Sequence, residues 1–379
     1  MVEFSKEELE RYSRHLIIPE FNIKGQRKLK QAKVLVVGTG GLGSPLLLYL
    51  TAAGVGEIGI LDFDVVDESN LQRQVLFTVD DVGKSKAETA KKRLQKLNPH
   101  IKLNVYNTQL TSENALEIIK DYDVVADGTD NFPTRYLVND ACVLLGKVNV
   151  YASIFRFEGQ VSVFNHKDAE GVRGPNYRDL FPSPPPPGLV PSCAEGGVIG
   201  VLPGILGSLQ ASEVIKVISG VGDPLSGRLF LIDTLTFETR TLKLHKQKKS
   251  DPITELIDYD HFCGIGTETI EKEEVKEVSV KDLEAMFNNG NGFQLIDVRE
   301  TYEYEIANIG GELIPLAEIE NAIEKISSEK KVVVHCRSGV RSAKAIKTLE
   351  KKYGFSNLYN LKGGILAWAH EIDHDMATY

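Results

Sequence analysis

A glycine-rich turn is the first group of residues in this 379-residue chain that could do chemistry. Gly38, Gly40 and Gly43 lie between a short β-branched run and a helical stretch. Such glycines permit a tight turn and close approach of the backbone to a ligand, and the N-terminus of the following helix attracts phosphate. Asp62 ends the next apolar run, where a carboxylate can accept hydrogen bonds from ribose hydroxyls. These residues predict a nucleotide site, and on them alone a nicotinamide-dependent oxidoreductase stays open.

Three further polar residues favour adenylation over hydride transfer. They are Arg73 in Ser-Asn-Leu-Gln-Arg-Gln, Lys86 in Gly-Lys-Ser-Lys, and Asp130 in Asp-Gly-Thr-Asp-Asn. Attack at the α-phosphorus of ATP loads charge onto its oxygens, so Arg73 and Lys86 make sense as cationic clamps. Hydride transfer leaves the phosphates unreacted and would not explain them. Asp130, at the carboxyl end of a strand, is a natural Mg²⁺ ligand, so we expect ATP and Mg²⁺ as cofactors.

Cys336 is the second candidate reactive group. It ends the run Lys331-Val-Val-Val-His-Cys336 and is followed by Arg337-Ser-Gly-Val-Arg341. The backbone N–H groups of a loop over a helix N-terminus can point at the sulfur, and Arg337 and Arg341 add positive charge. Such a cradle would stabilise a thiolate or its persulfide. Only four residues separate Cys336 from Arg341, one fewer than in the phosphatase pattern, which disfavours phosphatase chemistry.

The other cysteines divide into one candidate and two passive residues. Cys193 follows a proline-rich loop at 182–192 and precedes a helical stretch, a position that favours the thiolate. A buried small side chain is the alternative for Cys193. Cys142 lies in an apolar segment with a helical pattern and is expected in the core. Cys263 has no second cysteine nearby in the sequence. The four cysteines form no CxxC pair, so we expect neither a disulfide scaffold nor zinc.

The elements that must position these groups alternate between strand and helix, which predicts an α/β fold with a Rossmann-like, doubly wound parallel sheet. A second, smaller α/β unit begins at Val275, after an acidic stretch of little periodicity. The expected domains are 1–246 and 275–379, joined by a solvated, extended linker at 247–274.

Composition narrows the classes of partner. The 44 basic and 53 acidic residues give a net charge of −9, which argues against a nucleic-acid binder. The first residues lack the apolar core of a signal peptide. The apolar stretch 198–209 is interrupted by Pro203 and is too short to span a bilayer. We therefore expect a cytoplasmic protein that binds neither nucleic acid nor membranes.

In combination, several motifs resemble the MoeB/ThiF-type adenylyltransferases, relatives of ubiquitin-activating enzymes, over about residues 5 to 245. The motifs are Arg11-Tyr-Ser-Arg14, the glycine turn, Ser-Asn-Leu-Gln-Arg-Gln, Asp-Gly-Thr-Asp-Asn and Gly159-Gln-Val. The resemblance implies ATP-dependent adenylation of the C-terminal Gly-Gly carboxylate of a ubiquitin-like sulfur carrier protein. It also implies a homodimer in which Arg14 reaches the phosphates in the neighbouring subunit. The residues expected to bind the nucleotide are Gly38, Gly40, Gly41, Gly43, Asp62, Asn70, Arg73, Gln74, Lys86, Asp130 and Asn131.

One departure from that family concerns metal. Its members often bind zinc through two CxxC pairs, whereas this chain has Pro175-Asn-Tyr-Arg-Asp179 and Asp260-His-Phe-Cys263 in those regions. We expect no zinc here, and Asp130 as the metal ligand for Mg²⁺.

Residues 276 to 379 resemble the rhodanese family of sulfurtransferases. The resemblance rests on Asp297-Val-Arg-Glu300, the Cys336 loop and Leu361-Lys-Gly-Gly-Ile-Leu-Ala-Trp368, while the segment Asn308-Ile-Gly-Gly-Glu312 departs from the usual one. Asp297 and Trp368 are expected to be structural.

The two resemblances together imply one reaction sequence. A Cys336 persulfide, charged by a cysteine-desulfurase-type donor or by thiosulfate, would deliver sulfur to the adenylated carrier. Cys193 is the candidate to hold the carrier covalently. The product would be a carrier thiocarboxylate for molybdopterin, thiamine or tRNA thiolation. The alternatives are an adenylation-only protein or a scaffold with a degenerate rhodanese domain, and the oxidoreductase is disfavoured.

Overall fold

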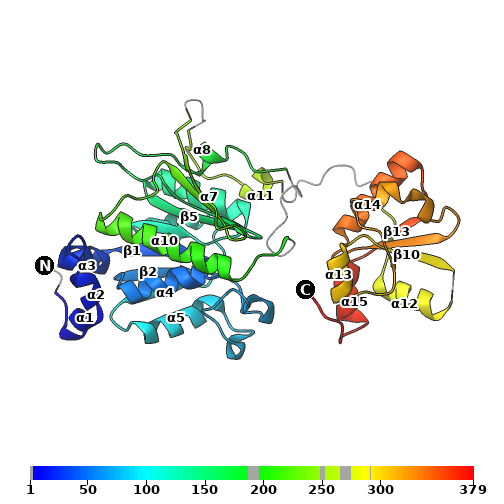
Figure 1. The fold of residues 1–379 in the computed structure, drawn as a ribbon, viewed down its shortest axis with the longest axis horizontal. Coiled ribbons are helices and arrows are strands. Elements are labelled where there is room, and N and C mark those ends of the chain that lie inside the picture. The colour runs from blue at the N-terminus through cyan, green and yellow to red at the C-terminus, as the bar shows by residue number, and fades with distance from the viewer. Residues whose placement is uncertain (1–2, 187–195, 248–251, 265–274, 291) are drawn as a thin grey trace. The chain divides into compact units, whose positions relative to one another are not determined.

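The computed structural model describes residues 3–186, 196–247, 252–264, 275–290 and 292–379. The chain divides into two compact units, Met1–Thr267 and Glu268–Tyr379, each with its own sheet and core (Figure 1). This is the mixed α/β architecture that the alternating pattern predicts.

The first unit is built on an eight-stranded sheet in the order β3-β2-β1-β4-β5-β6-β7-β8. The five strands β1 to β5 are parallel to one another, and β6, β7 and β8 are each antiparallel to the strand before them. Val37 at the end of β1 pairs with Leu61 of β2 and with Asp127 of β4. The carboxyl ends of these three strands therefore lie at one edge, where ligands of open α/β sheets bind. The strands are β1 Lys33–Val37, β2 Glu57–Leu61, β3 Lys102–Tyr106, β4 Val124–Asp127, β5 Val148–Phe155, β6 Glu158–Phe164, β7 Arg228–Asp233 and β8 Thr239–Lys243.

Helices cover both faces of this sheet. Val34 and Val36 of β1 are buried in a core with α3, α4, α5 and α10, while Leu35 and Val37 face the core formed with α6, α7, α8 and α11 (Figure 1). A strand buried on both faces reads as a continuous apolar run, which is why Lys33–Val37 is recognisable from sequence. The helices are α1 Lys6–Arg11, α2 Ser13–Leu16, α3 Asn22–Gln31, α4 Gly43–Ala53, α5 Lys86–Leu97, α6 Ala115–Ile119, α7 Phe132–Leu145, α8 Tyr177–Leu180, α10 Val201–Ser219 and α11 Tyr259–Phe262.

Helix α10 is longer than the apolar stretch 198–209 indicates. It runs from Val201 to Ser219 and contains Pro203. Pro203 lies in the first turn, where its missing N–H breaks no intrahelical hydrogen bond, so the helix continues through it. Within the described residues, it is the one helix long and apolar enough to cross a membrane. It packs against α3, α4, β5 and β6 of the first unit.

The described part of the acidic stretch is not wholly extended. Residues 252–264 include the helical turn α11, and Tyr259 is buried in the core beside α7. The Tyr259 hydroxyl donates a hydrogen bond of 2.8 Å to Asp140. This aromatic anchor ties the segment to the first unit, and the low hydrophobic periodicity around it hides the contact from sequence analysis.

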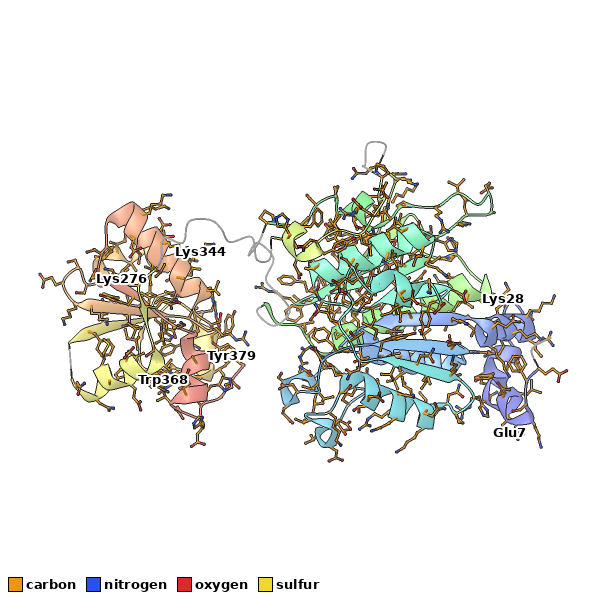
Figure 2. The ribbon with its side chains drawn as sticks, turned by 180° about the vertical axis from the view of Figure 1, so that it is seen from behind. Glu7, Lys28, Lys276, Lys344, Trp368 and Tyr379 are labelled. Carbon is orange, nitrogen blue, oxygen red and sulfur yellow. The ribbon has the colours of Figure 1, made fainter. Side chains whose placement is uncertain are left out.

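The second unit has a parallel five-stranded sheet in the order β11-β10-β12-β13-β9. Trp368 of α15, labelled in Figure 2, is partly buried against the core and packs edge-on against the exposed Phe287 of α12, with ring centroids 5.9 Å apart. The elements are β9 Glu277–Val278, α12 Val280–Asn288, β10 Phe293–Asp297, α13 Thr301–Ile306, β11 Glu312–Leu313, β12 Lys331–His335, α14 Val340–Tyr353, β13 Leu358–Leu361 and α15 Gly364–Glu371.

Candidate active sites

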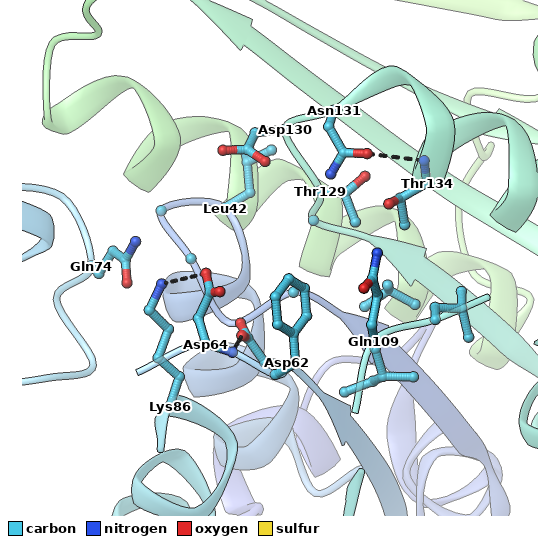
Figure 3. Close-up of a pocket in the computed structure, with 18 of the residues that line it drawn as sticks. Leu42, Asp62, Asp64, Gln74, Lys86, Gln109, Thr129, Asp130, Asn131 and Thr134 are labelled. Carbon is cyan, nitrogen blue, oxygen red and sulfur yellow. Dashed lines mark hydrogen bonds and ion pairs between the residues drawn. The ribbon is translucent and has the colours of Figure 1, made fainter. Parts of the chain in front are cut away.

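A pocket lies at the carboxyl ends of β1, β2 and β4 in the first unit (Figure 3). The structure brings nine of the residues expected at the nucleotide together in its lining: Gly38, Gly40, Gly41, Asp62, Arg73, Gln74, Lys86, Asp130 and Asn131. The lining also includes Phe63, Asp64, Gln109, Thr129 and Thr134, which the motifs did not single out.

The glycine turn is fastened to β2 through Asp62. One carboxylate oxygen of Asp62 accepts from the backbone N–H and the hydroxyl of Thr39, each at 2.7 Å, and the other accepts from the N–H of Asp64 at 2.9 Å. Gly43 lies outside the pocket lining in the described residues, and its part is steric: a Cβ there would lie 2.0 Å from the carbonyl oxygen of Gly38. Asp62 therefore shapes the turn, and its contact with a ribose stays a prediction.

Lys86 is paired with Asp64 inside the pocket. The Nζ atom lies 3.1 Å from a carboxylate oxygen of Asp64, and the Lys86 side chain is only 7% exposed (Figure 3). The backbone N–H of Lys86 also donates to the carbonyl oxygen of Asp64 at 2.9 Å. The motifs did not single out Asp64. Its position, two residues after the Asp62 that follows β2, could have indicated it. A nearly buried ammonium held by a half-exposed carboxylate can exchange that partner for a phosphate.

A short turn carries Arg73 and Gln74 to the pocket. The carbonyl oxygen of Asn70 accepts from the backbone N–H groups of Arg73 and Gln74, so Asn70 supports the turn from outside the described lining. Arg73 donates to the carbonyl oxygen of Ser69 at 3.1 Å. Gln74 is 4% exposed, and its side-chain oxygen has no hydrogen-bond partner among the described residues. That orphaned acceptor beside the glycine turn is a polar group available to a ligand.

Asp127 and Asp130 at the end of β4 have different environments. Asp127 is fully buried, burial raises the pKa of its carboxyl, and one oxygen accepts from the N–H and hydroxyl of Thr129. Asp130 lines the pocket, and Asn131 caps α7 by accepting from the N–H of Thr134 at 3.0 Å. No cluster of three or more metal-binding side chains occurs in the described residues. One or two carboxylates suit Mg²⁺, which takes its other ligands from phosphates and water, so the residues present fit that ion.

The remaining residues expected in the first unit lie elsewhere. Arg14 is exposed on α2 and is outside the described pocket lining of its own chain. Cys193 falls in 187–195, outside the described residues. Cys142 is fully buried, and burial raises the pKa of its thiol. Burial likewise raises the pKa of Cys263, to about 11, so both thiols are core residues.

The Cys336 loop has the geometry that the sequence predicts. Cys336 directly follows β12 and is 1% exposed. The backbone N–H of Gly339 lies 3.2 Å from the sulfur, and the hydroxyl of Ser342 lies 3.4 Å from it. Gly339 has φ = 96°, which turns its N–H inward at the start of α14. The sulfur is thus a hydrogen-bond acceptor at a helix N-terminus.

The two arginines of this loop are each held by a partner distant in sequence. Both terminal nitrogens of Arg341 donate to the carboxylate of Glu303 at 2.6 Å, and Arg337 donates through Nε to the carbonyl oxygen of Tyr379 at 2.6 Å. Burial would raise the pKa of Glu303, but the hydrogen bonds from Arg341 and from a backbone N–H outweigh burial and lower it. Glu303 therefore offsets part of the positive charge expected around Cys336.

Residues beneath the loop are structural. Asp297 and Arg299 form a fully buried ion pair at 2.5 Å. His335, just before Cys336, is fully buried, and burial lowers its pKa to about 4, so its imidazole is neutral at pH 7. A neutral imidazole adds no charge to the cradle.

Comparison with known proteins places both units. Residues 12–253 match the ThiF family, and residues 279–371 match the rhodanese-like domain. The chain is 49% identical to the probable adenylyltransferase/sulfurtransferase MoeZ of Mycobacterium tuberculosis, over 99% of this chain and 96% of that protein. It is 54% identical to the sulfur carrier protein adenylyltransferase of Thermus thermophilus, over 69% of this chain and 99% of that protein.

A more distant animal relative and a solved structure agree with this placement. Adenylyltransferase and sulfurtransferase MOCS3 of Mus musculus is 41% identical, over 99% of this chain and 88% of that protein. The crystal structure of E. coli MccB with ATP has a TM-score of 0.54 at 24% identity, covering 66% of this chain and 75% of that chain, and shows a shared fold. The chain belongs to the ThiF family and carries a rhodanese-like domain after its adenylation domain.

Proposed function

We propose that this enzyme adenylates the C-terminal Gly-Gly carboxylate of a ubiquitin-like sulfur carrier protein with ATP, and then converts it to a thiocarboxylate with sulfur from Cys336. The observation that carries the proposal is the pocket at the ends of β1, β2 and β4, which gathers Arg73, Lys86 and Asp130 beside the glycine turn. Two full-length relatives are named adenylyltransferase and sulfurtransferase, which supports both steps.

In the first step, an oxygen of the carrier's carboxylate attacks the α-phosphorus of ATP. The bond between the α-phosphorus and the oxygen that bridges it to the β-phosphate breaks, and pyrophosphate leaves. Arg73 and Lys86 stabilise the charge on the phosphates, and Asp64 releases Lys86 as the triphosphate enters. Mg²⁺ would be held by Asp130 and would neutralise phosphate charge. The Gly40 and Gly41 backbone approaches the ligand without side chains in the way.

In the second step, the terminal sulfur of a Cys336 persulfide attacks the carrier carbonyl and AMP leaves. The Gly339 N–H, which lies 3.2 Å from the cysteine sulfur, stabilises negative charge there. The Ser342 hydroxyl lies 3.4 Å from the same sulfur and 2.6 Å from Oδ1 of Asn360. A second thiol then attacks the Cys336 sulfur of the acyl disulfide, which releases the thiocarboxylate and leaves a disulfide for a thiol reductant. Cys193 is our candidate for covalent handling of the carrier.

A homodimer completes the proposal, with Arg14 reaching the partner's phosphates. An apolar groove lined by Phe21, Tyr49 and Ile215 among others lies beside α4 and α10. Tyr49 is 57% exposed at this groove. The persulfide chemistry suits a reducing cytoplasm, and the sulfur donor is a cysteine desulfurase or thiosulfate.

Replacing the transfer cysteine tests the proposal. Cys336→Ala should keep ATP–pyrophosphate exchange with a Gly-Gly carrier but should form no carrier thiocarboxylate. The thiocarboxylate is detected by mass spectrometry of the carrier, whose mass increases when one oxygen is replaced by sulfur. Cys142→Ala, which changes a buried core thiol, is the matched control and should keep both activities. Full retention of thiocarboxylate in Cys336→Ala with thiosulfate as donor would contradict the role of Cys336.

A further inference from the structure

Tyr379 contacts the arginine beside Cys336 and the residues behind it. Its backbone carbonyl oxygen accepts from Nε of Arg337 at 2.6 Å. Its hydroxyl accepts from Arg299 at 2.5 Å and lies 3.2 Å from a carboxylate oxygen of Glu303. The guanidinium carbons of Arg337 and Arg299 lie 5.5 and 5.8 Å from the ring centroid, so the ring lies against two cations. Figure 2 labels Tyr379 in the second unit.

These contacts connect Tyr379 to both arginines of the Cys336 loop by separate routes. The backbone oxygen holds Arg337 directly, and the hydroxyl reaches Glu303, whose carboxylate takes both terminal nitrogens of Arg341. Arg337 directly follows Cys336, and Arg341 lies in the first turn of α14. One residue therefore restrains both arginines of the Cys336 loop.

The surroundings of the hydroxyl make these contacts specific to tyrosine. Burial raises the pKa of Tyr379, so the phenol stays protonated at neutral pH and donates to Glu303 while it accepts from Arg299. Arg299 is itself fixed by the fully buried ion pair with Asp297. Phenylalanine would keep the ring against the two cations and lose both hydroxyl contacts.

We propose that Tyr379 is a positioning residue for sulfur transfer at Cys336 and acts through Arg337. An arginine side chain free to sample its rotamers must be ordered each time an anionic sulfur donor binds. Arg337, the residue that follows Cys336, is held by the main-chain oxygen and the ring of Tyr379, so its side chain loses less conformational freedom when the donor binds. This inference rests on the proposed function of Cys336 as the persulfide carrier.

A double-mutant cycle on the full-length chain tests the inference, with sulfur transfer from thiosulfate to cyanide as the readout. Tyr379→Ala should lower kcat/KM roughly tenfold, mainly by raising KM for thiosulfate. A tenfold effect is within the range of interaction energies measured between residues in contact. Tyr379→Phe should lose less, because its ring still lies against Arg337, whereas Tyr379→Ala keeps only the main-chain oxygen. In an Arg337→Ala background, Tyr379→Ala should add no further loss. A purely structural role predicts the same loss in both backgrounds.

The matched control is Tyr353→Ala at the other end of α14. The Tyr353 hydroxyl also bonds a glutamate, Glu320 at 3.0 Å, but on an exposed surface, so kcat/KM should be unchanged. Wild-type rates in Tyr379→Ala, or an equal loss with and without Arg337, would overturn the inference alone. A wild-type chain that transfers no sulfur from either thiosulfate or a cysteine desulfurase would contradict the proposed function and the inference with it.

Discussion

Lys86 and Asp64 form an ion pair of 3.1 Å within the pocket at the ends of β1, β2 and β4, and the lysine is the more deeply buried partner, 7% exposed against 52%. A buried cation needs a compensating partner, and in the chain without ligand Asp64 supplies it. A triphosphate brings several negative oxygens to the same place. The pair therefore holds the Lys86 side chain at the place that we propose for the triphosphate.

Lys86→Met should lower carrier-dependent ATP–pyrophosphate exchange by about 10²-fold, the usual effect of removing one group that stabilises transition-state charge. Lys102→Met is the matched control, because Lys102 makes an ion pair of the same 3.1 Å length with Glu57 but is 65% exposed and outside the described pocket lining. The control should exchange at the wild-type rate. Exchange by Lys86→Met within twofold of wild type would remove Lys86 from the site.

Gly43→Ala should destabilise the first unit by about 3 kcal/mol, because the added Cβ would lie 2.0 Å from the Gly38 carbonyl oxygen and force the turn open. ATP binding should be lost with it. Gly204→Ala is the control: it lies in α10, and nothing is within 4 Å of its added Cβ. Higher helix propensity should make that variant as stable as wild type or more so. Urea unfolding and ATP titration measure both effects, and a wild-type midpoint for Gly43→Ala would disprove the steric role.

Glu303 should make the stability of the second unit depend on acid pH. Its pKa is lowered in the folded chain, so its contribution is fully present above its ordinary pKa of 4.5 and is lost as pH falls from there through the folded value. Thermal melts should therefore show Glu303→Gln less stable than wild type at pH 7, with the difference shrinking below pH 4.5. A difference that is constant from pH 7 to pH 3 would show that the ion pair with Arg341 does not set it.

Local sequence patterns predicted most of the residues that line the pocket of the first unit, because many of them sit on the glycine turn or directly after a strand, where neighbours in sequence are neighbours in space. Gly38, Asp62 and Asp130 are examples. Glu303 and Tyr379 could not be found this way. Glu303 lies 38 residues from Arg341 and Tyr379 lies 42 residues from Arg337, so only the folded sheet of the second unit brings each pair together.

Two misjudged elements have the same kind of cause. Pro203 suggested an interruption, yet the first turn of a helix tolerates proline, and α10 begins before it. Tyr259 lies in an acidic stretch typical of a linker, yet its ring and hydroxyl bind the first unit through Asp140. In both cases the position of one residue in the fold outweighed the composition around it.

ATP–pyrophosphate exchange by the full-length chain, with and without a small ubiquitin-like protein ending in Gly-Gly, tests the central claim most directly. The account predicts exchange only when the carrier is present, and none with a carrier that lacks its last glycine. Absence of exchange with several intact carriers, while ATP still binds in the pocket, would contradict adenylation and favour a binding scaffold.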